Sequence, residues 1–101
     1  MKKIINGKLY NTQTANGLAS WDNHCQPGNF NYVEEILYRK RSGEFFLYAY
    51  GGAMSIYAER FENGSCGSSH IIPLTEAEAR EWAESHVTGD KYMEIFGEVE
   101  E

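Results

Sequence analysis

The stretch VEEILYRKRSGEFFLYAY, residues 33–50, constrains the fold most, because it predicts a β-hairpin that is apolar on both faces. Successive side chains of a strand point to opposite faces of a sheet. On the return strand both alternating sets are apolar or aromatic: Phe45, Leu47 and Ala49 on one face, and Phe46, Tyr48 and Tyr50 on the other. Each face must therefore be covered by other parts of the chain or by a partner. We expect Phe45 and Leu47 to face a helix layer and the tyrosines to lie on a half-exposed second face.

The first ten residues predict a second, shorter hairpin. Asn6 and Gly7 stand between two short apolar runs, at residues 4–5 and 9–10. Asparagine and glycine tolerate the positive φ that a type I′ turn requires at both central positions. The chain therefore starts with two antiparallel strands.

The segment after this hairpin is expected to be irregular. Asn11 or Thr12 could cap a short helical turn that contains three apolar residues, Ala15, Leu18 and Ala19. Residues 22–31, DNHCQPGNFN, are rich in turn formers and predict a surface loop. Trp21 and Phe30 would hold the two ends of this loop against the core.

Gly51 and Gly52 interrupt the strand pattern after the long hairpin. A tight turn or a bulge explains them better than a phosphate loop, which would need a lysine and a following helix. The next stretch, AMSIYAERF at residues 53–61, alternates in polarity and predicts a strand. A short helix is the alternative, because alanine, methionine and glutamate are good helix formers.

A flexible turn around Asn63 and Gly64 is expected next, followed by a short strand, HIIPL, at residues 70–74. Pro73 has no amide hydrogen, so it belongs at a sheet edge or at a strand end.

Residues 75–87 give the clearest helix signal. Thr75 and Glu78 fit the capping box T-x-x-E, in which each side chain satisfies a backbone amide at the helix start. Apolar spacing defines one packing face, which consists of Ala79, Trp82, Ala83 and His86. A second helical segment follows and is expected to end at Gly97, with three side chains turned inward: Tyr92, Ile95 and Phe96.

Strands first and helices last predict an α+β fold. We expect a single domain over residues 1–101, with a small antiparallel sheet of about four to six strands and the C-terminal helices packed on one face. No apolar run approaches the ~20 residues that a membrane span needs, and the N-terminus lacks the apolar stretch of a secretory signal. A cytoplasmic protein is therefore expected, in which Cys25 and Cys66 are reduced thiols.

The formal net charge of −6 is unevenly distributed along the chain. Residues 1–75 carry seven basic and six acidic side chains, whereas residues 76–101 carry two basic and nine acidic ones. Such acidic helices either only add solubility or favour cationic partners, and they disfavour direct contact with nucleic-acid phosphates. The candidate partner-binding carboxylates lie on the expected helices: Glu76, Glu81, Glu84, Asp90 and Glu94.

The sequence contains incomplete patterns for a zinc site and for a nucleophilic active site. Cys66 and His70 have roughly the spacing of a zinc-ligand pair, but the adjacent His24 and Cys25 would diverge and not complete the site. No local signature surrounds a nucleophilic cysteine or serine. We therefore expect no metal, no cofactor and no catalytic residue.

Two charged clusters are the remaining alternatives. Glu34, Glu35 and Glu44 lie near strand ends or a turn, where carboxylates are commonly solvated, so a catalytic pair is not expected. The basic turn at residues 39–41 has aromatic neighbours and could contact RNA. The negative charge of the whole protein opposes that contact.

Four stretches together resemble a family of small proteins of this length that is scattered through phages, plasmids and conjugative elements of Firmicutes: MKKIINGKLYNTQTA, EEILYRKRSGEFFLYAYGGAMSIYAE, IIPLTEAEAREWAESH and YMEIFGEVEE. The likeness covers most of the chain, and residues 17–31 and 63–69 differ most. Relatives of this kind have been linked to anti-CRISPR activity, including activity against Cas9 systems.

The resemblance implies a non-enzymatic inhibitor that binds a bacterial Cas effector, with Cas9 or its guide complex as the first candidate. The interface would use the five helix carboxylates or the aromatic sheet face, where Tyr48 and Tyr50 are the expected contacts. One alternative is a regulatory or interaction module of a mobile element without a Cas target, and another is a small nuclease-like enzyme that acts on guide RNA. A homodimer is expected if the second sheet face is apolar and uncovered.

Overall fold

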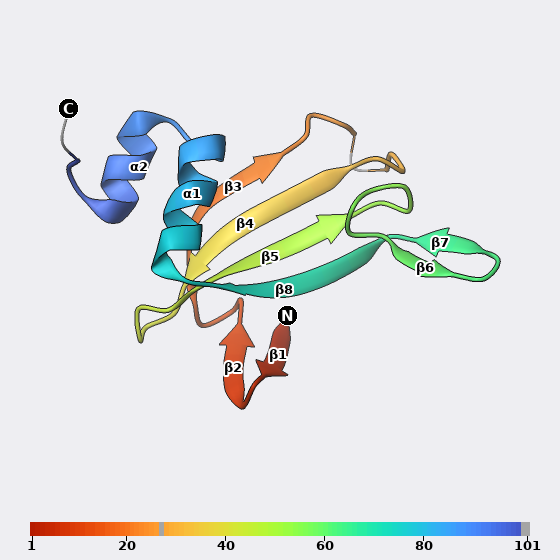
Figure 1. Ribbon diagram of the computed structural model, residues 1–101, viewed down its shortest axis with the longest axis horizontal. Coiled ribbons are helices and arrows are strands. Elements are labelled where there is room, and N and C mark those ends of the chain that lie inside the picture. Colours follow the sequence, from red (N-terminus) through yellow and green to blue (C-terminus); the bar gives the residue numbers. More distant parts are fainter. Residues whose placement is uncertain (27, 100–101) are drawn as a thin grey trace.

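The computed structural model of the protein describes residues 1–26 and 28–99 and has the expected α+β architecture. Its centre is a four-stranded antiparallel sheet with strand order β3-β4-β5-β8, accompanied by the hairpins β1–β2 and β6–β7 and by two C-terminal helices (Figure 1). The elements are β1 (Lys2–Ile5), β2 (Lys8–Asn11), β3 (Asn16–Asp22), β4 (Val33–Arg39), β5 (Phe45–Gly51), β6 (Glu59–Phe61), β7 (Gly64–Cys66), β8 (Ser68–Leu74), α1 (Glu76–His86) and α2 (Gly89–Phe96).

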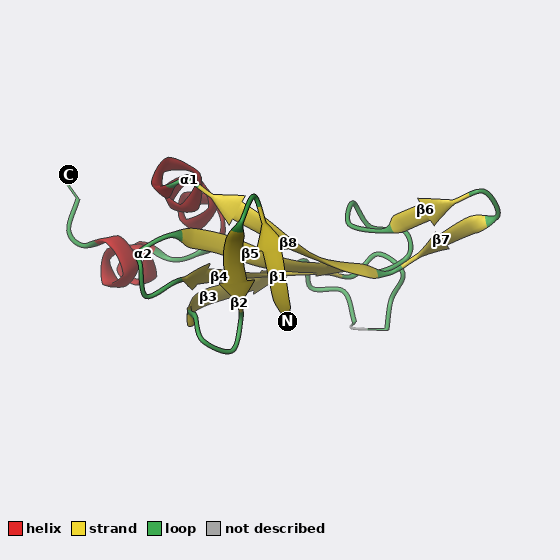
Figure 2. Ribbon diagram, turned by 90° about the horizontal axis from the view of Figure 1, so that it is seen from below, coloured by secondary structure: helices red, strands yellow, loops and turns green. Residues whose placement is uncertain are grey.

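The molecule is elongated, with extents of 50 × 33 × 20 Å. The helices lie at one end of the sheet, and the β6–β7 hairpin projects from the opposite end (Figure 1). Seen from below, α1 lies on one side of the sheet (Figure 2). Within the part of the chain that the structure describes, no helix has the length and apolar character needed to cross a membrane.

The long hairpin forms the two central strands, as the sequence predicts. Each residue from Val33 to Arg39 pairs with one from Gly51 to Phe45, so β4 and β5 match along their whole length. The face toward the helices forms the main core, which consists of Leu37, Phe45, Leu47, Ala79, Trp82 and Ala83. The expectation that Phe45 and Leu47 face the helices is therefore confirmed.

The second face of the central strands is covered by the N-terminal hairpin and is not half-exposed where Phe46 lies. Asn6 and Gly7 have φ values of 52° and 78°, as the predicted turn requires. The hairpin lays Tyr10 edge-on against Phe46, with ring centroids 5.4 Å apart, and Phe46 has no exposed surface. Part of the second face is therefore covered by the chain itself, which is one of the two kinds of cover that the sequence predicted.

Strand β3 occupies most of the segment expected to be a helical turn, so that expectation is wrong beyond Ala15. The amides of Thr14 and Ala15 do donate to the carbonyl of Asn11, which gives one turn. Leu18 and Ala19 then lie in β3, where Ala19 pairs with Leu37 of β4 and Leu18 is the residue skipped at a register shift between Gly17 and Ala19. Tertiary pairing outweighs a short capping signal here.

The expected strand over residues 53–61 is largely a turn, and only its last three residues form β6. Met54 and Ile56 are 63% and 82% exposed, so alternation did not indicate burial in this segment. The turn around Asn63 is part of a hairpin, because β7 pairs with β6. Phe30, expected to hold a loop end against the core, is instead 65% exposed.

A close backbone approach explains the double glycine. A Cβ at Gly52 would lie 2.6 Å from the carbonyl oxygens of Asn29 and Phe30. The amide of Gly52 also donates to the Tyr32 carbonyl at 2.8 Å. A turn does begin at Gly52, whose carbonyl accepts from the amide of Ser55 at 3.0 Å, whereas Gly51 is the last residue of β5. The turn packs directly against the β3–β4 loop.

The C-terminal elements follow the sequence signals closely. Strand β8 is an edge strand, which suits Pro73. Thr75 and Glu78 form both halves of the capping box at the start of α1. Helix α2 stops at Phe96, and the expected Gly97 caps its end with a φ of 92°. The second packing face is formed as expected, with Ile95 buried and Tyr92 and Phe96 partly buried against the main core.

Candidate functional site

The five carboxylates predicted to bind a partner all lie on the surface of α1 and α2, and we call this set the acidic helical face. Each of the five residues is exposed. The residues on the inner side of α1, Ala79, Trp82 and Ala83, are buried, so the helix is amphipathic. The face consists of Glu76, Glu81, Glu84, Asp90 and Glu94.

Arg80 fixes the two helices to each other. Its Nη1 donates to the hydroxyl of Tyr92 at 3.2 Å, and its guanidinium lies 4.8 Å from the ring centroid of Phe96. The hydrogen bond to Tyr92 raises the pKa of Arg80 above its usual value. Burial lowers this pKa in part, and the hydrogen bond to Glu76 raises it further. The acidic helical face is therefore presented by a helix pair joined by side-chain contacts.

The two cations of this region are both engaged within the helices. Arg80 Nε lies 3.2 Å from a carboxylate oxygen of Glu76, and Lys91 Nζ lies 3.3 Å from one of Glu94. Glu81 and Glu84 form no ion pair with any residue in the described part of the chain, and neither does Asp90. The face therefore keeps an uncompensated negative charge.

Tyr48 and Tyr50 lie on the opposite face of the sheet from the helices. Both are half-buried. The hydroxyl of Tyr48 lies 3.2 Å from Oγ of Ser69, and the ring of Tyr50 lies 6.2 Å from that of Tyr32. Their side chains are thus already engaged in packing within the sheet, which leaves only part of each ring for a partner.

A buried carboxylate in the middle of the fold was missed by sequence reasoning. Glu35 is only 7% exposed, so the expectation that it is solvated is wrong. Its oxygens accept hydrogen bonds from Trp82 Nε1 at 2.9 Å and from the hydroxyl of Tyr57. His86 Nε2 lies 3.8 Å away, and the imidazole packs between Trp82 and Trp21.

This carboxylate links three separate segments: β4, α1 and the turn before β6. Burial and the hydrogen bond to Glu35 raise the pKa of Tyr57, so its hydroxyl stays protonated as a donor. The turn is held further by the carbonyl of Tyr57, which lies 3.0 Å from Nε2 of His70. A cavity of about 590 Å³ between β3 and the α1–α2 junction reaches His86, but Glu35 does not line it. The cluster therefore has the character of a structural cross-link.

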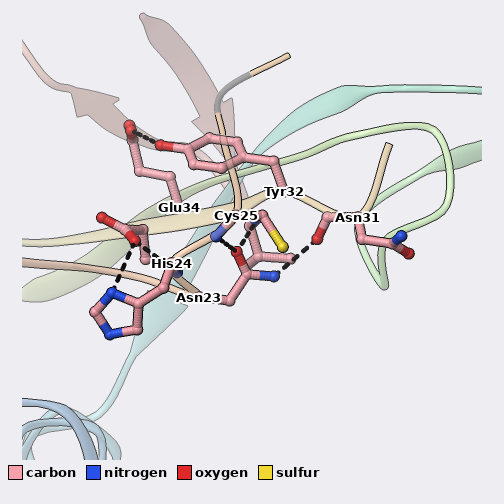
Figure 3. Close-up of polar contacts among 8 residues, drawn as sticks. Asn23, His24, Cys25, Asn31, Tyr32 and Glu34 are labelled. Atoms are coloured by element: carbon pink, nitrogen blue, oxygen red, sulfur yellow. Dashed lines mark hydrogen bonds and ion pairs between the residues drawn. The ribbon is translucent and has the colours of Figure 1, made fainter. Parts of the chain in front are cut away.

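The β3–β4 loop is organised by Asn23 (Figure 3). Its Nδ2 donates to the carbonyl of Asn31 at 2.7 Å, and its Oδ1 accepts from the amides of Val33 and Cys25 at 3.2 and 3.3 Å. At the start of β4, the hydroxyl of Tyr32 donates to Glu34 at 2.6 Å. The loop is thus a hydrogen-bonded surface structure, as expected from its composition.

The histidine and cysteine residues do not assemble into a shared site. His24 is exposed and lies 3.9 Å from Asp22, whereas His70 contacts the carbonyl of Tyr57. Cys25 and Cys66 are free thiols. Over residues 1–26 and 28–99, no three histidine, cysteine, aspartate or glutamate side chains lie close enough together to hold a metal ion.

No protein-family model matches the chain, and no match was found among the curated proteins or the solved structures.

Proposed function

We propose that the protein is a non-enzymatic anti-CRISPR inhibitor that acts in the cytoplasm of the host bacterium. Its acidic helical face would dock on a basic surface of a Cas effector, with Cas9 or its guide complex as the first candidate. The supporting observation is the set of five exposed carboxylates on two linked helices, of which three have no ion-pair partner in the described part of the chain.

The physical basis is charge complementarity. Surfaces that hold nucleic acid are rich in lysine and arginine because they neutralise phosphates. A compact negative surface can compete for such a channel, and opposite potentials speed the encounter. A partner bound in this way would associate quickly, and its affinity would fall as the salt concentration rises.

The acidic helical face is preferred to the tyrosine face as the contact surface. Tyr48 and Tyr50 point away from the helices, so one flat partner surface cannot cover both sets. The sheet face also carries the N-terminal hairpin, which buries Phe46 under Tyr10. The homodimer was expected only for an uncovered sheet face, so the cover that the hairpin provides makes a homodimer through this face a weaker proposal.

A plasmid-interference assay with a test variant and a control variant tests the proposal. The test variant neutralises the face with Glu76→Gln, Glu81→Gln, Glu84→Gln, Asp90→Asn and Glu94→Gln, and it retains Glu78 because that side chain caps α1. The control carries Glu59→Gln and Glu62→Gln on the distant β6–β7 hairpin. We expect the wild type and the control to block interference and the test variant to lose that effect.

The outcome separates the proposal from its alternatives. Full interference in the presence of abundant wild-type protein would reject the anti-CRISPR function. A pull-down from the host that recovers a protein other than a Cas subunit would instead favour a regulatory module. Truncation of guide RNA by the purified protein and magnesium would favour the nuclease.

A further inference from the structure

The basic side chains of the first 75 residues gather in one region. Six of the seven lie either in the hairpin β1–β2 or at residues 39–41, where β4 meets the turn before β5, whereas Arg60 lies in β6. The two segments meet because Lys8 Nζ lies 2.9 Å from a carboxylate oxygen of Glu44. We call this set the basic cluster, and it consists of Lys2, Lys3, Lys8, Arg39, Lys40 and Arg41.

Among the residues that the structure describes, one carboxylate is the direct counter-ion of the basic cluster. Glu44 pairs with Lys8 and lies 3.8 Å from Nζ of Lys40. Lys40 is also held over the ring of Tyr10, 3.6 Å from the centroid, so its charge is fixed in place. Arg41 is exposed and forms no ion pair with any residue that the structure describes. A positive excess therefore remains.

Two adjoining hollows form a concave surface beside the basic side chains of residues 39–41. One has a volume of about 360 Å³ and the other about 410 Å³, and both are lined by Thr14, Lys40 and Arg41. Asn11 lines the first hollow, and Asn16 and Arg39 line the second. A hydroxyl, amide groups and guanidinium groups are the donors that bind phosphate oxygens in proteins.

We propose that these two hollows bind the phosphate backbone of a single-stranded nucleic acid. The net charge of the whole chain disfavours such contact, but that argument averages over charges that the fold separates. The acidic excess is confined to residues 76–101, and exposed charges beyond about 8 Å are largely screened at physiological salt. This assignment uses a different surface from the acidic helical face and does not rest on the proposed function.

The test is fluorescence anisotropy with the full chain and a labelled single-stranded RNA, at several salt concentrations. Contact with two or three phosphates predicts a slope of log K against log salt of about −1.4 to −2. Arg41→Gln removes one contact, so we expect weaker binding at low salt and a slope smaller in magnitude by about 0.7. Arg60→Gln, on the distant β6, is the matched control and should bind like the wild type.

Further probes identify the source of the phosphate. Single-stranded DNA should bind much as RNA does, because the proposed contacts are to the backbone. The proposal is overturned if no binding occurs at low salt, or if Arg41→Gln and Arg60→Gln behave alike. Tighter binding of a duplex would reject the single-strand assignment. Equal displacement by inorganic polyphosphate, at equal charge, would reject nucleic acid as the ligand.

Discussion

The hydrogen bonds of Glu35 predict a large effect from a single substitution, Glu35→Leu. The side chain of Glu35 accepts from two donors, Trp82 Nε1 and the Tyr57 hydroxyl, in a position that is 7% exposed. Leucine would leave both donors without an acceptor, and two such losses cost about 4 kcal/mol. Burial of the leucine side chain offsets about 2 kcal/mol. The free energy of unfolding should therefore fall by about 2 kcal/mol.

Urea unfolding followed by circular dichroism measures this change. With a typical denaturant slope, the midpoint should fall by about 1–2 M. Glu62→Leu, in the exposed turn between β6 and β7, makes the same chemical change where no such donors lie, and it should shift stability by less than about 0.5 kcal/mol. Glu35→Gln should fall between the two variants, because its amide can accept from Trp82 and donate to the oxygen of Tyr57.

A double-mutant cycle separates lost hydrogen bonds from altered packing. In a Trp82→Phe background one donor is already absent, so Glu35→Leu should cost about 1–3 kcal/mol less than in the wild type. Buried charges can sometimes be replaced by apolar side chains without loss. An unchanged or raised midpoint for Glu35→Leu would refute the assignment of Glu35 as a structural cross-link.

Three further predictions concern local features of the fold. Gly52→Ala should destabilise the protein by about 1–3 kcal/mol in thermal unfolding, because its Cβ would meet backbone oxygens at 2.6 Å. The control Gly28→Ala should be tolerated, because its Cβ would meet nothing within 4 Å. Equal melting temperatures for the two variants would contradict this prediction. Thr75→Ala removes the cap of α1 and should cost about 1 kcal/mol by the same measurement, and no loss would show that the cap is dispensable. The hydrogen bond to Glu34, with burial, raises the pKa of Tyr32 to about 12, and the pKa of Tyr57 is raised as well. Ultraviolet titration should therefore find late-ionising tyrosines, and Tyr32→Phe should remove the part of that late signal which belongs to Tyr32. Because the folded pKa is the higher one, the stabilisation from Tyr32 is present below pH 10.0 and is lost as the pH rises toward about 12. An equal fall in stability over this range in the wild type and in Tyr32→Phe would argue against it.

Local sequence signals predicted the elements that depend on few residues. Asn6 and Gly7 specify a turn by their own conformational preferences, and the capping box at Thr75 needs only residues within one helical turn. The alternation on β5 likewise indicated which residues would face the helices. In these elements the conformation is determined by residues that lie within a few positions of one another in the sequence.

The misassigned elements depend on partners that are distant in the sequence. Strand β3 forms because β4 supplies its hydrogen bonds, and nothing local distinguishes it from a capped turn. Glu35 is buried by Tyr57 and Trp82, which lie 22 and 47 residues away along the chain. A carboxylate in a strand gives no local indication of such partners, so solvation was the natural expectation.

The candidate surfaces also differ in whether local sequence or distant contacts determine them. Exposure of the helix carboxylates could be predicted, because amphipathic spacing assigns them to the outer side of each helix. The basic turn at residues 39–41 is visible in the sequence, but its union with the lysines of the N-terminal hairpin could not be predicted, because the two segments meet only in the fold, through Lys8 and Glu44. Net charge alone therefore gave an incomplete description of the electrostatics.

The most direct measurement of the central claim is the affinity of the purified protein for a Cas9–guide RNA complex. The account predicts that the wild type and the Glu59→Gln/Glu62→Gln control bind alike. It predicts that neutralisation of Glu76, Glu81, Glu84, Asp90 and Glu94 weakens binding by about fivefold or more, since exposed charge pairs contribute about 0.2–1 kcal/mol each. No binding by the wild type, or equal dissociation constants for all three proteins, would contradict it.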